Sequence, residues 1–415
     1  MVPELVEGLL KEYFMKKILV LAAVLSLAAG LFAEPAFSGY SGGKINYSTN
    51  EQDTENYNPD LKLQAFFQGQ FNFSQNMWGR LEFSIDTDDF LSKELFHKTA
   101  ASFEIDELSL IFKSNTDTGA NYFSVFMGTY DPIGSDIFLQ RYFGIQPIAS
   151  KITESWLGIA GSILYPHFGI GIADVKRLTN APITLGGYAY INHEDRLYYV
   201  FNVDFRFACV YRYFTFDFAG GLGIPLSNSN QGKEVIAAIE KIYWHAGTTM
   251  LVGNNYTQSL FIQAGLFNAP FTKRNGTEIS ANDLYLLFEP RFLIENAHVN
   301  LTLYSVPKDT ADKLMFVEDT LGANLNIYGD SFSIGANRFT IGTNFSFSFV
   351  DKTLLDLKKP MELIKGDFNI TMTPYMSTNF LSGELHTQVS VKFMKFATAR
   401  WYEAFTADIG YTARF

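Results

Sequence analysis

The last fifteen residues, Trp401–Phe415 (WYEAFTADIGYTARF), carry the pattern that decides the fold. Every second position is apolar, with Glu403 as the one break: Trp401, Phe405, Ala407, Ile409, Tyr411, Ala413 and Phe415. The positions between them are mostly polar or small. This alternation predicts a β-strand with one apolar and one polar face. In an open sheet, a final strand of this kind would leave an unprotected edge.

A closed barrel removes that edge, because its last strand pairs with its first. The segment resembles the C-terminal strand of bacterial outer-membrane β-barrel proteins of the porin type, which commonly ends in Phe after alternating apolar residues. The resemblance implies that Ile409, Tyr411 and Phe415 form an assembly signal. It also implies that outer-membrane lipid and the barrel-assembly machinery are partners, and it leaves a homotrimer open.

The same alternation recurs along the whole chain. In 61–73 the apolar residues oppose a face of Lys, Gln and Asn, and 339–349 and 385–393 repeat the pattern. About eighteen polar faces without intervening core helices predict a shared wet interior, with the apolar faces toward lipid. The fold class expected is therefore all-β, a transmembrane antiparallel β-barrel.

The candidate strands number one too many for a bacterial barrel, which has an even count. The expectation is therefore eighteen strands, with sixteen as the alternative. The surplus is expected between residues 154 and 192, as one strand split at Pro166 or near Thr179–Pro182. The candidates are 37–48, 61–74, 79–87, 103–113, 121–130, 154–165, 167–176, 182–192, 196–209, 212–223, 243–253, 257–267, 282–294, 297–306, 318–328, 331–350, 367–377, 380–396 and 401–415.

The breaks between strands predict two different ends of the barrel. Tight turns at Gly329-Asp330, 295–297 and 253–256 are expected on the periplasmic side, as the resemblance requires. The long breaks, such as 131–153 and 351–366, are then expected outside. Short helices are predicted in two loops, 233–243 and 354–364, from apolar residues three or four apart.

The N-terminus predicts secretion. Met15–Ala33 (MKKILVLAAVLSLAAGLFA) has two lysines, an apolar run and small residues at its end, as in a signal peptide. The domain expectation is a signal peptide over 1–33, with the true start at Met15, followed by a barrel domain over 34–415. A membrane anchor is the alternative interpretation of the run.

Composition narrows the function classes. Aromatic residues make up 16% of the chain and charged residues 18%, and the net charge is −11. The aromatic excess fits membrane-interface girdles, and the negative charge argues against nucleic acid as a partner. Cys209 is the single cysteine, and the six histidines are scattered, so no metal site, cofactor or enzyme chemistry is expected.

The loop 131–153 is the strongest candidate site. It follows the acidic strand start at Asp106-Glu107 and a further strand, an order that resembles porins whose next loop folds into the lumen. The resemblance implies a pore constriction formed by Asp131, Asp136, Arg141 and Lys151, in which opposed charges create a transverse field. The alternative is an external loop packed over the barrel mouth by Ile137, Phe138, Leu139 and Phe143.

Alternation also places charged residues on the inner wall. Each could tune selectivity, although any water-filled lumen carries such residues. The expected lumen-lining set is Arg80, Glu82, Glu104, Glu107, Asp204, Arg206, Glu289, Arg291, Glu384 and Lys392, with Tyr188, Tyr190 and Tyr198 as inward-facing aromatics.

The function expected is a porin-like channel in the bacterial outer membrane for diffusion of small hydrophilic solutes. The alternatives are a hydrophobic-substrate transporter of the fatty-acid type and a surface adhesin or antigen mounted on a barrel. An outer-membrane hydrolase, with His, Ser and Asp brought together from separate strands, is a further alternative.

Overall fold

A computed structural model describes residues 36–49, 59–87, 101–153, 168–195, 198–226, 237, 242–270, 279–280, 283–311, 314–335, 337–397 and 401–415. These residues form one antiparallel sheet of 18 strands in which each strand pairs with its neighbours in the chain. The strands are β1 Ala36–Thr49, β2 Pro59–Ser74, β3 Met77–Thr87, β4 Ala101–Thr116, β5 Gly119–Thr129, β6 Phe168–Leu178, β7 Ile183–Asp195, β8 Tyr198–Tyr211, β9 Phe214–Leu226, β10 Tyr243–Gly253, β11 Ser259–Pro270, β12 Leu284–Ile294, β13 Ala297–Ser305, β14 Leu321–Ile334, β15 Asn337–Phe349, β16 Phe368–Phe380, β17 Gly383–Lys392 and β18 Phe405–Arg414.

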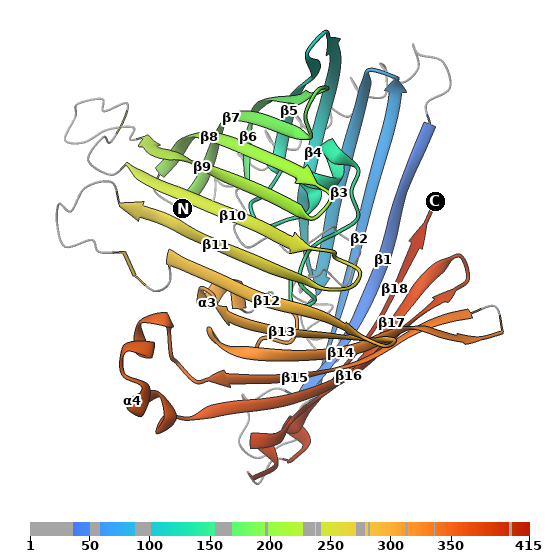
Figure 1. Ribbon diagram of the computed structural model, residues 1–415, viewed down its shortest axis with the longest axis vertical. Helices are drawn as coiled ribbons and strands as arrows, with labels where there is room; N and C mark the ends of the chain where they lie inside the picture. Colours follow the sequence, from blue (N-terminus) through green and yellow to red (C-terminus); the bar gives the residue numbers. More distant parts are fainter. Residues whose placement is uncertain are drawn as a thin grey trace, which may run out of the picture.

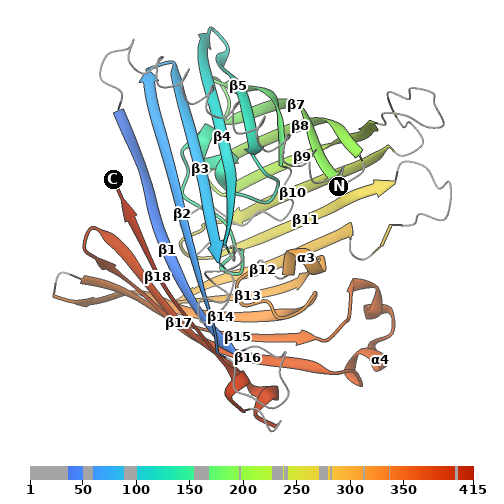
Figure 2. The same ribbon diagram turned by 180° about the vertical axis from the view of Figure 1, so that it is seen from behind.

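The sheet closes on itself. β1 pairs with β2 on one side and with β18 on the other, in a register that runs from Tyr40 opposite Arg414 to Tyr47 opposite Ala407. The first and last strands lie side by side in both views of the ribbon (Figures 1 and 2). Closure satisfies the backbone hydrogen-bonding groups of both terminal strands, so the barrel has no free edge.

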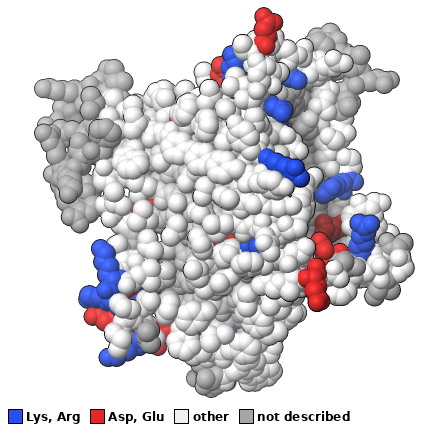
Figure 3. Space-filling view, in the orientation of Figure 1, with Lys and Arg blue, Asp and Glu red and all other residues white. Residues whose placement is uncertain are grey.

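The two faces of the wall have opposite polarity. On β13, Leu301 and Leu303 are exposed on the outside, whereas the alternating residues Asn300 and Thr302 are buried on the inside. The same division holds on β12, where Phe288 and Phe292 are exposed and Glu289 and Arg291 are buried. Figure 3 shows that the middle of the visible outer face is almost free of charged side chains, which gather at its margins. An apolar exterior around a polar interior is the arrangement that a barrel needs to stand in lipid.

The strand count of eighteen is confirmed, and the alternative of sixteen is wrong. β6 and β7 are two strands joined by a turn at 179–182, so the expectation that 167–176 and 182–192 are one strand divided near Thr179–Pro182 is wrong. β5 pairs directly with β6. The candidate strand 154–165 and the break at Pro166 lie outside the described residues.

Four predicted strands need correction at their boundaries: 318–328, 331–350, 380–396 and 401–415. Gly329 and Asp330 lie within β14, because a register shift between Gly329 and Phe332 absorbs them, and the turn comes instead at Gly335 with φ of 64°. The terminal strand begins only at Phe405, since Trp401–Ala404 forms the short helix η5. Glu403, which breaks the alternation, lies in that helix.

The connections separate the two ends of the barrel as expected. Short turns such as Glu295–Asn296 lie at the end where β18 finishes, and the strand ends that the long connections follow lie at the other: Thr49, Thr87, Thr129, Phe349 and Lys392. The predicted helical loop 354–364 contains the helices η3 Leu354–Lys358 and α4 Pro360–Ile364. Residues 1–35, with the expected signal peptide, lie outside the described residues, as does nearly all of the predicted helix 233–243. Among the residues described, no helix is both long and apolar enough to cross a bilayer.

Candidate functional site: the infolded loop and the lumen wall

The loop that follows β5 enters the barrel. Its helix α2, Ile137–Phe143, buries Ile137, Phe138, Leu139 and Tyr142. Phe138, Leu139 and Tyr142 belong to an apolar cluster with inward-facing wall residues such as Val175 and Phe261. The loop therefore lies in the lumen, as one of the two interpretations of its sequence predicted. The apolar residues that favoured an external position anchor it inside instead.

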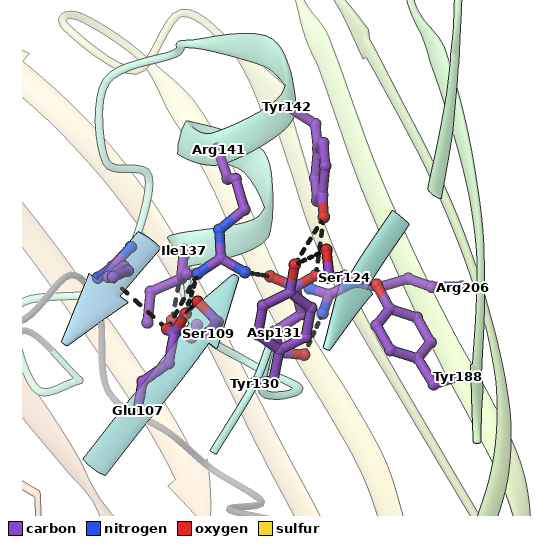
Figure 4. Close-up of polar contacts among 12 residues, drawn as sticks. Glu107, Ser109, Ser124, Tyr130, Asp131, Ile137, Arg141, Tyr142, Tyr188 and Arg206 are labelled. Carbon is purple, nitrogen blue, oxygen red and sulfur yellow. Dashed lines mark hydrogen bonds and ion pairs between the residues drawn. The ribbon is translucent and has the colours of Figure 1, made fainter. Parts of the chain in front are cut away.

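Arg141 ties the helix to the wall. Its guanidinium donates to both carboxylate oxygens of Glu107 on β4, at 2.8 and 2.9 Å, and to Asp131 Oδ1 at 2.6 Å. Figure 4 shows the Arg141 side chain reaching from α2 between these two carboxylates. Arg80 extends the network, since its Nε lies 3.7 Å from Glu107 Oε2 and it also binds Glu82. All these groups are buried or nearly so, which makes the network a strong and geometrically demanding anchor.

A β-bulge lets β4 supply this anchor. The register with β3 shifts between Glu82 and Phe83, so that Glu82 faces Glu107 while Phe83 faces Ile105. Glu104 and Glu107 can therefore both face inward although strict alternation would separate them. Across the other edge, Glu107 pairs with Gly128, whose φ of 110° is available to glycine at little cost. Glu104 itself is exposed.

A second anchor holds the start of the loop to β8. Arg206 donates to the backbone oxygen of Asp131 at 2.5 Å and forms a bidentate pair with Asp217, at 2.8 and 2.5 Å. Its guanidinium lies 4.0 Å from the centre of the Phe138 ring, and only 1% of Arg206 is exposed. Asp204, two residues earlier on β8, is hydrogen-bonded to the Tyr190 hydroxyl and to His245.

Further contacts fasten the loop to β11 and β12. Gln263 donates to the Gly134 oxygen at 2.9 Å, and Ser150 binds Glu289. Arg291 donates to the backbone oxygens of Ile148 and Ala149, at 3.0 and 3.1 Å. These contacts place Glu289 and Arg291 on the inner wall, as predicted, in the role of loop supports.

The four predicted constriction residues do not form one group. Asp131 and Arg141 meet each other, but Asp136 accepts the amides of Ile148 and Ala149 at 2.9 and 2.8 Å and so braces the loop internally. Lys151 lies apart, with Nζ 5.3 Å from the centre of the Tyr328 ring. In the described residues, the opposed charges of the loop region are therefore in direct contact instead of facing one another across open water.

The tyrosines near the loop act as neutral donors. Tyr188 donates to Asp131 Oδ2 at 3.0 Å, and Tyr130 donates to Ser124 at 2.7 Å. Burial raises the pKa of Tyr130 to about 12, so its phenol keeps its proton at physiological pH. Tyr188 and Tyr190 fill the space beside the loop, and the Tyr198 side chain lies outside the described residues.

A different part of the inner wall keeps water-accessible charges. Lys392 and Glu318 form an ion pair of 2.9 Å in which the side chains are 30% and 21% exposed. Lys44 lies 3.7 Å from Asp408 and is 23% exposed, and Glu384 lies 3.6 Å from His386. Lys44, Asp408, Glu318 and His386 were not on the predicted list. Alternation could have found the strand residues, but it does not distinguish covered from open wall.

No cluster of His, Cys, Asp and Glu suited to a metal ion occurs in the described part of the chain. Cys209 is buried and lies on β8 opposite Ile183.

No protein-family model matches the chain, and no curated protein matches it. Among solved structures, a mutant of the Rh. blastica porin is similar over 92% of this chain and 100% of its own, at 11% identity and a TM-score of 0.43. The high-pH structure of Pseudomonas putida OprB is similar over 92% of this chain and 94% of its own, at 8% identity and a TM-score of 0.42. Values this low make the barrel's own construction, and not the likeness, the basis for classifying the chain.

That construction is decisive on physical grounds. A closed antiparallel barrel with an apolar, exposed exterior and a polar interior is built to span a lipid bilayer, since no backbone group is left unpaired toward lipid. A loop folded into the lumen follows the fifth strand. The chain is an integral β-barrel protein of the outer membrane.

Proposed function

We propose that the barrel is a channel through which small hydrophilic solutes diffuse across the outer membrane. The observation that carries this proposal is the uneven exposure of the inner wall. The charges next to the infolded loop are buried in ion pairs, as in Arg141–Glu107, where the side chains are 6% and 1% exposed. On β1 and β17 the inward charges stay in contact with water.

This contrast predicts an off-axis conduit. The loop occupies the side of the lumen formed by β3–β12, and the path runs along β16–β18 and β1. Its lining is mixed in sign, because Lys44 is near Asp408 and Lys392 is near Glu318. A mixed lining favours weak ion selectivity, and conduction requires that solutes leave as readily as they enter.

The partners proposed with this function are outer-membrane lipid, the barrel-assembly machinery, small hydrophilic solutes and further copies of the chain in a homotrimer. The constriction role of Asp131, Asp136, Arg141 and Lys151 is proposed in a changed form. These residues set the width of the conduit by holding the loop in place, and the path does not run between them.

Conductance of the purified, refolded protein in planar bilayers tests the function. A salt gradient across the bilayer then reports ion preference. We expect discrete conductance steps with at most a mild preference for cations, in keeping with the net charge of −11. If the protein is shown to be folded by its heat-modifiable mobility on gels and still gives no conductance, an open channel is excluded and the adhesin alternative is favoured.

A further inference from the structure

A neutral hydrogen-bonding surface faces the lumen on β13–β16. It consists of two adjacent cross-strand rows, which we call the neutral wall. In one row Thr302, Asn324, Ser346 and Thr371 are successive partners, and in the other Asn300, Asn326, Asn344 and Thr373 are successive partners. None of these eight residues is more than 4% exposed, and none is charged.

Several amide atoms of this wall have no partner within the described residues. Neither Nδ2 nor Oδ1 of Asn344 has a hydrogen-bond partner there, so the result does not depend on which way the amide is turned. Asn324 donates to the Phe316 oxygen at 3.0 Å, and Asn326 accepts from the Tyr375 hydroxyl at 2.8 Å. The second polar atom of each, Asn324 Oδ1 and Asn326 Nδ2, is unpaired. Buried donors and acceptors are normally paired, so this concentration on one wall points to a ligand.

Two aromatic rings flank the amides. Tyr304 lies against Gly322 and Tyr375 against Gly342, in positions where an added Cβ would overlap each ring. The missing side chains of these glycines let the rings lie along the wall. A surface of this kind combines apolar ring faces with neutral donors and acceptors.

We propose that the neutral wall binds a neutral, polyhydroxylated solute of the sugar class, through the side chains of Asn324, Asn326 and Asn344. Each hydroxyl of such a solute both donates and accepts, which matches the free amide N–H and C=O groups. A carboxylate or an ammonium group buried there would lose its hydration and meet no opposite charge. The proposal rests on the channel function, because the wall is reached through the lumen.

The segment Phe316–Glu318 covers this wall. The Phe316 ring lies 5.8 Å from that of Tyr375, and Glu318 binds Lys392 at 2.9 Å and Thr371 at 3.3 Å. Phe316 has a φ of 60°, a conformation that costs energy for a bulky residue. A strained segment held by a partly exposed ion pair is a cover that a solute can displace.

Current block by sugars in planar bilayers tests the proposal. Maltose is the neutral probe, and maltobionate, in which the reducing glucose unit is opened and oxidised to a gluconate, is the charged probe. We expect maltose to reduce the ion current saturably and maltobionate to reduce it without saturation. In Asn344→Leu the half-blocking maltose concentration rises roughly fivefold, as the loss of one or two neutral hydrogen bonds predicts. Glu318→Gln lowers that concentration, because the cover is held less firmly.

Asn46→Leu is the matched control, since Asn46 is a lumen amide on β1 that pairs with Asp408 at 2.8 Å. Its maltose block is expected to equal that of the wild type. Equal, non-saturating effects of both sugars in every variant would overturn the binding site while leaving the channel intact. If the barrel gives no conductance, calorimetric titration of the detergent-solubilised protein with maltose tests the binding site directly. Saturable binding lost in Asn344→Leu upholds the site without the channel, and absence of binding overturns it.

Discussion

Phe415 and Gly39 exchange two backbone hydrogen bonds, each of 3.0 Å, with the amide of one residue donating to the carbonyl of the other. This pair extends the β1–β18 ladder to the last residue. The Phe415 ring lies 5.0 Å from that of Phe37 and 5.8 Å from that of Phe67, on the outer face of the seam. Phe415 thus joins the last strand to the first, through its backbone hydrogen bonds and through its ring.

Replacing Phe415 with Asp, or deleting it, should impair assembly into the outer membrane. The Asp variant keeps the backbone bonds to Gly39 but loses the ring contacts with Phe37 and Phe67, and it places a charge on the outer face. The deletion loses both. The amount of heat-modifiable, membrane-embedded protein measures the effect, and wild-type amounts in both variants would contradict a role for the terminal Phe in assembly.

Arg141→Met should loosen the infolded loop. Removal of the guanidinium leaves Glu107 and Asp131 buried without their shared partner, which costs about 3–5 kcal/mol for a buried ion pair. We expect a larger and noisier single-channel conductance and a lower urea midpoint for unfolding. Arg177→Met is the control, because exposed Arg177 contacts the same loop only through the Phe143 ring, at 5.7 Å. Equal effects of both changes would refute the anchoring role.

Charge reversal should separate the conduit from the buried network. Lys44→Glu and Lys392→Glu each place a negative charge on accessible wall beside Asp408 or Glu318, so we expect a clear shift toward cation preference. Asp136→Asn should leave the preference unchanged, since that carboxylate is turned onto the amides of Ile148 and Ala149. Reversal potentials in a salt gradient give the answer. A shift in Asp136→Asn alone would instead put the path through the loop.

Gly128→Ala should destabilise the barrel where β4 bulges. A Cβ at this position would overlap the Asp106 backbone oxygen, and the φ of 110° is unfavourable for alanine. The backbone strain alone costs about 1–3 kcal/mol. Gly187→Ala on β7 is the matched control, because a Cβ there meets nothing within 4 Å. The urea midpoints of unfolding of the two variants are compared, with heat-modifiable mobility on gels as the measure of folded protein. An equally stable Gly128→Ala variant would show that the bulge tolerates other conformations.

Much of the fold was predictable because alternation is a local property. Two successive side chains of a strand point to opposite faces, so the faces of residues such as Leu301 and Thr302 can be predicted without knowledge of the neighbouring strands. Most strand edges were predicted within three residues, but those of β14, β15, β17 and β18 were not. The turn between β14 and β15 comes later than predicted because of the register shift after Gly329, and the short helices η4 Phe393–Ala397 and η5 interrupt the period between β17 and β18.

The candidate site was predictable only as a list of residues. Alternation and the porin resemblance placed Glu107, Arg141 and Arg206 toward the lumen, but nothing in the sequence paired Arg141 with Glu107, 34 residues earlier, or Arg206 with Asp131, 75 residues earlier. Those pairs form between a loop helix and separate strands. The bulge at β4 that turns Glu107 inward is likewise a property of pairing with β3.

The sequence by itself determined that this chain forms strands with one wet and one apolar face, because that information repeats every second residue. Only the tertiary structure decided how many strands close the ring and which inner charges stay in water. Closure depends on the register between β1 and β18, whose residues lie more than 350 positions apart, as in the Asn46–Asp408 hydrogen bond. Exposure depends on where the infolded loop rests, since the same inward-facing charge is a buried anchor beneath that loop and a channel lining beyond it.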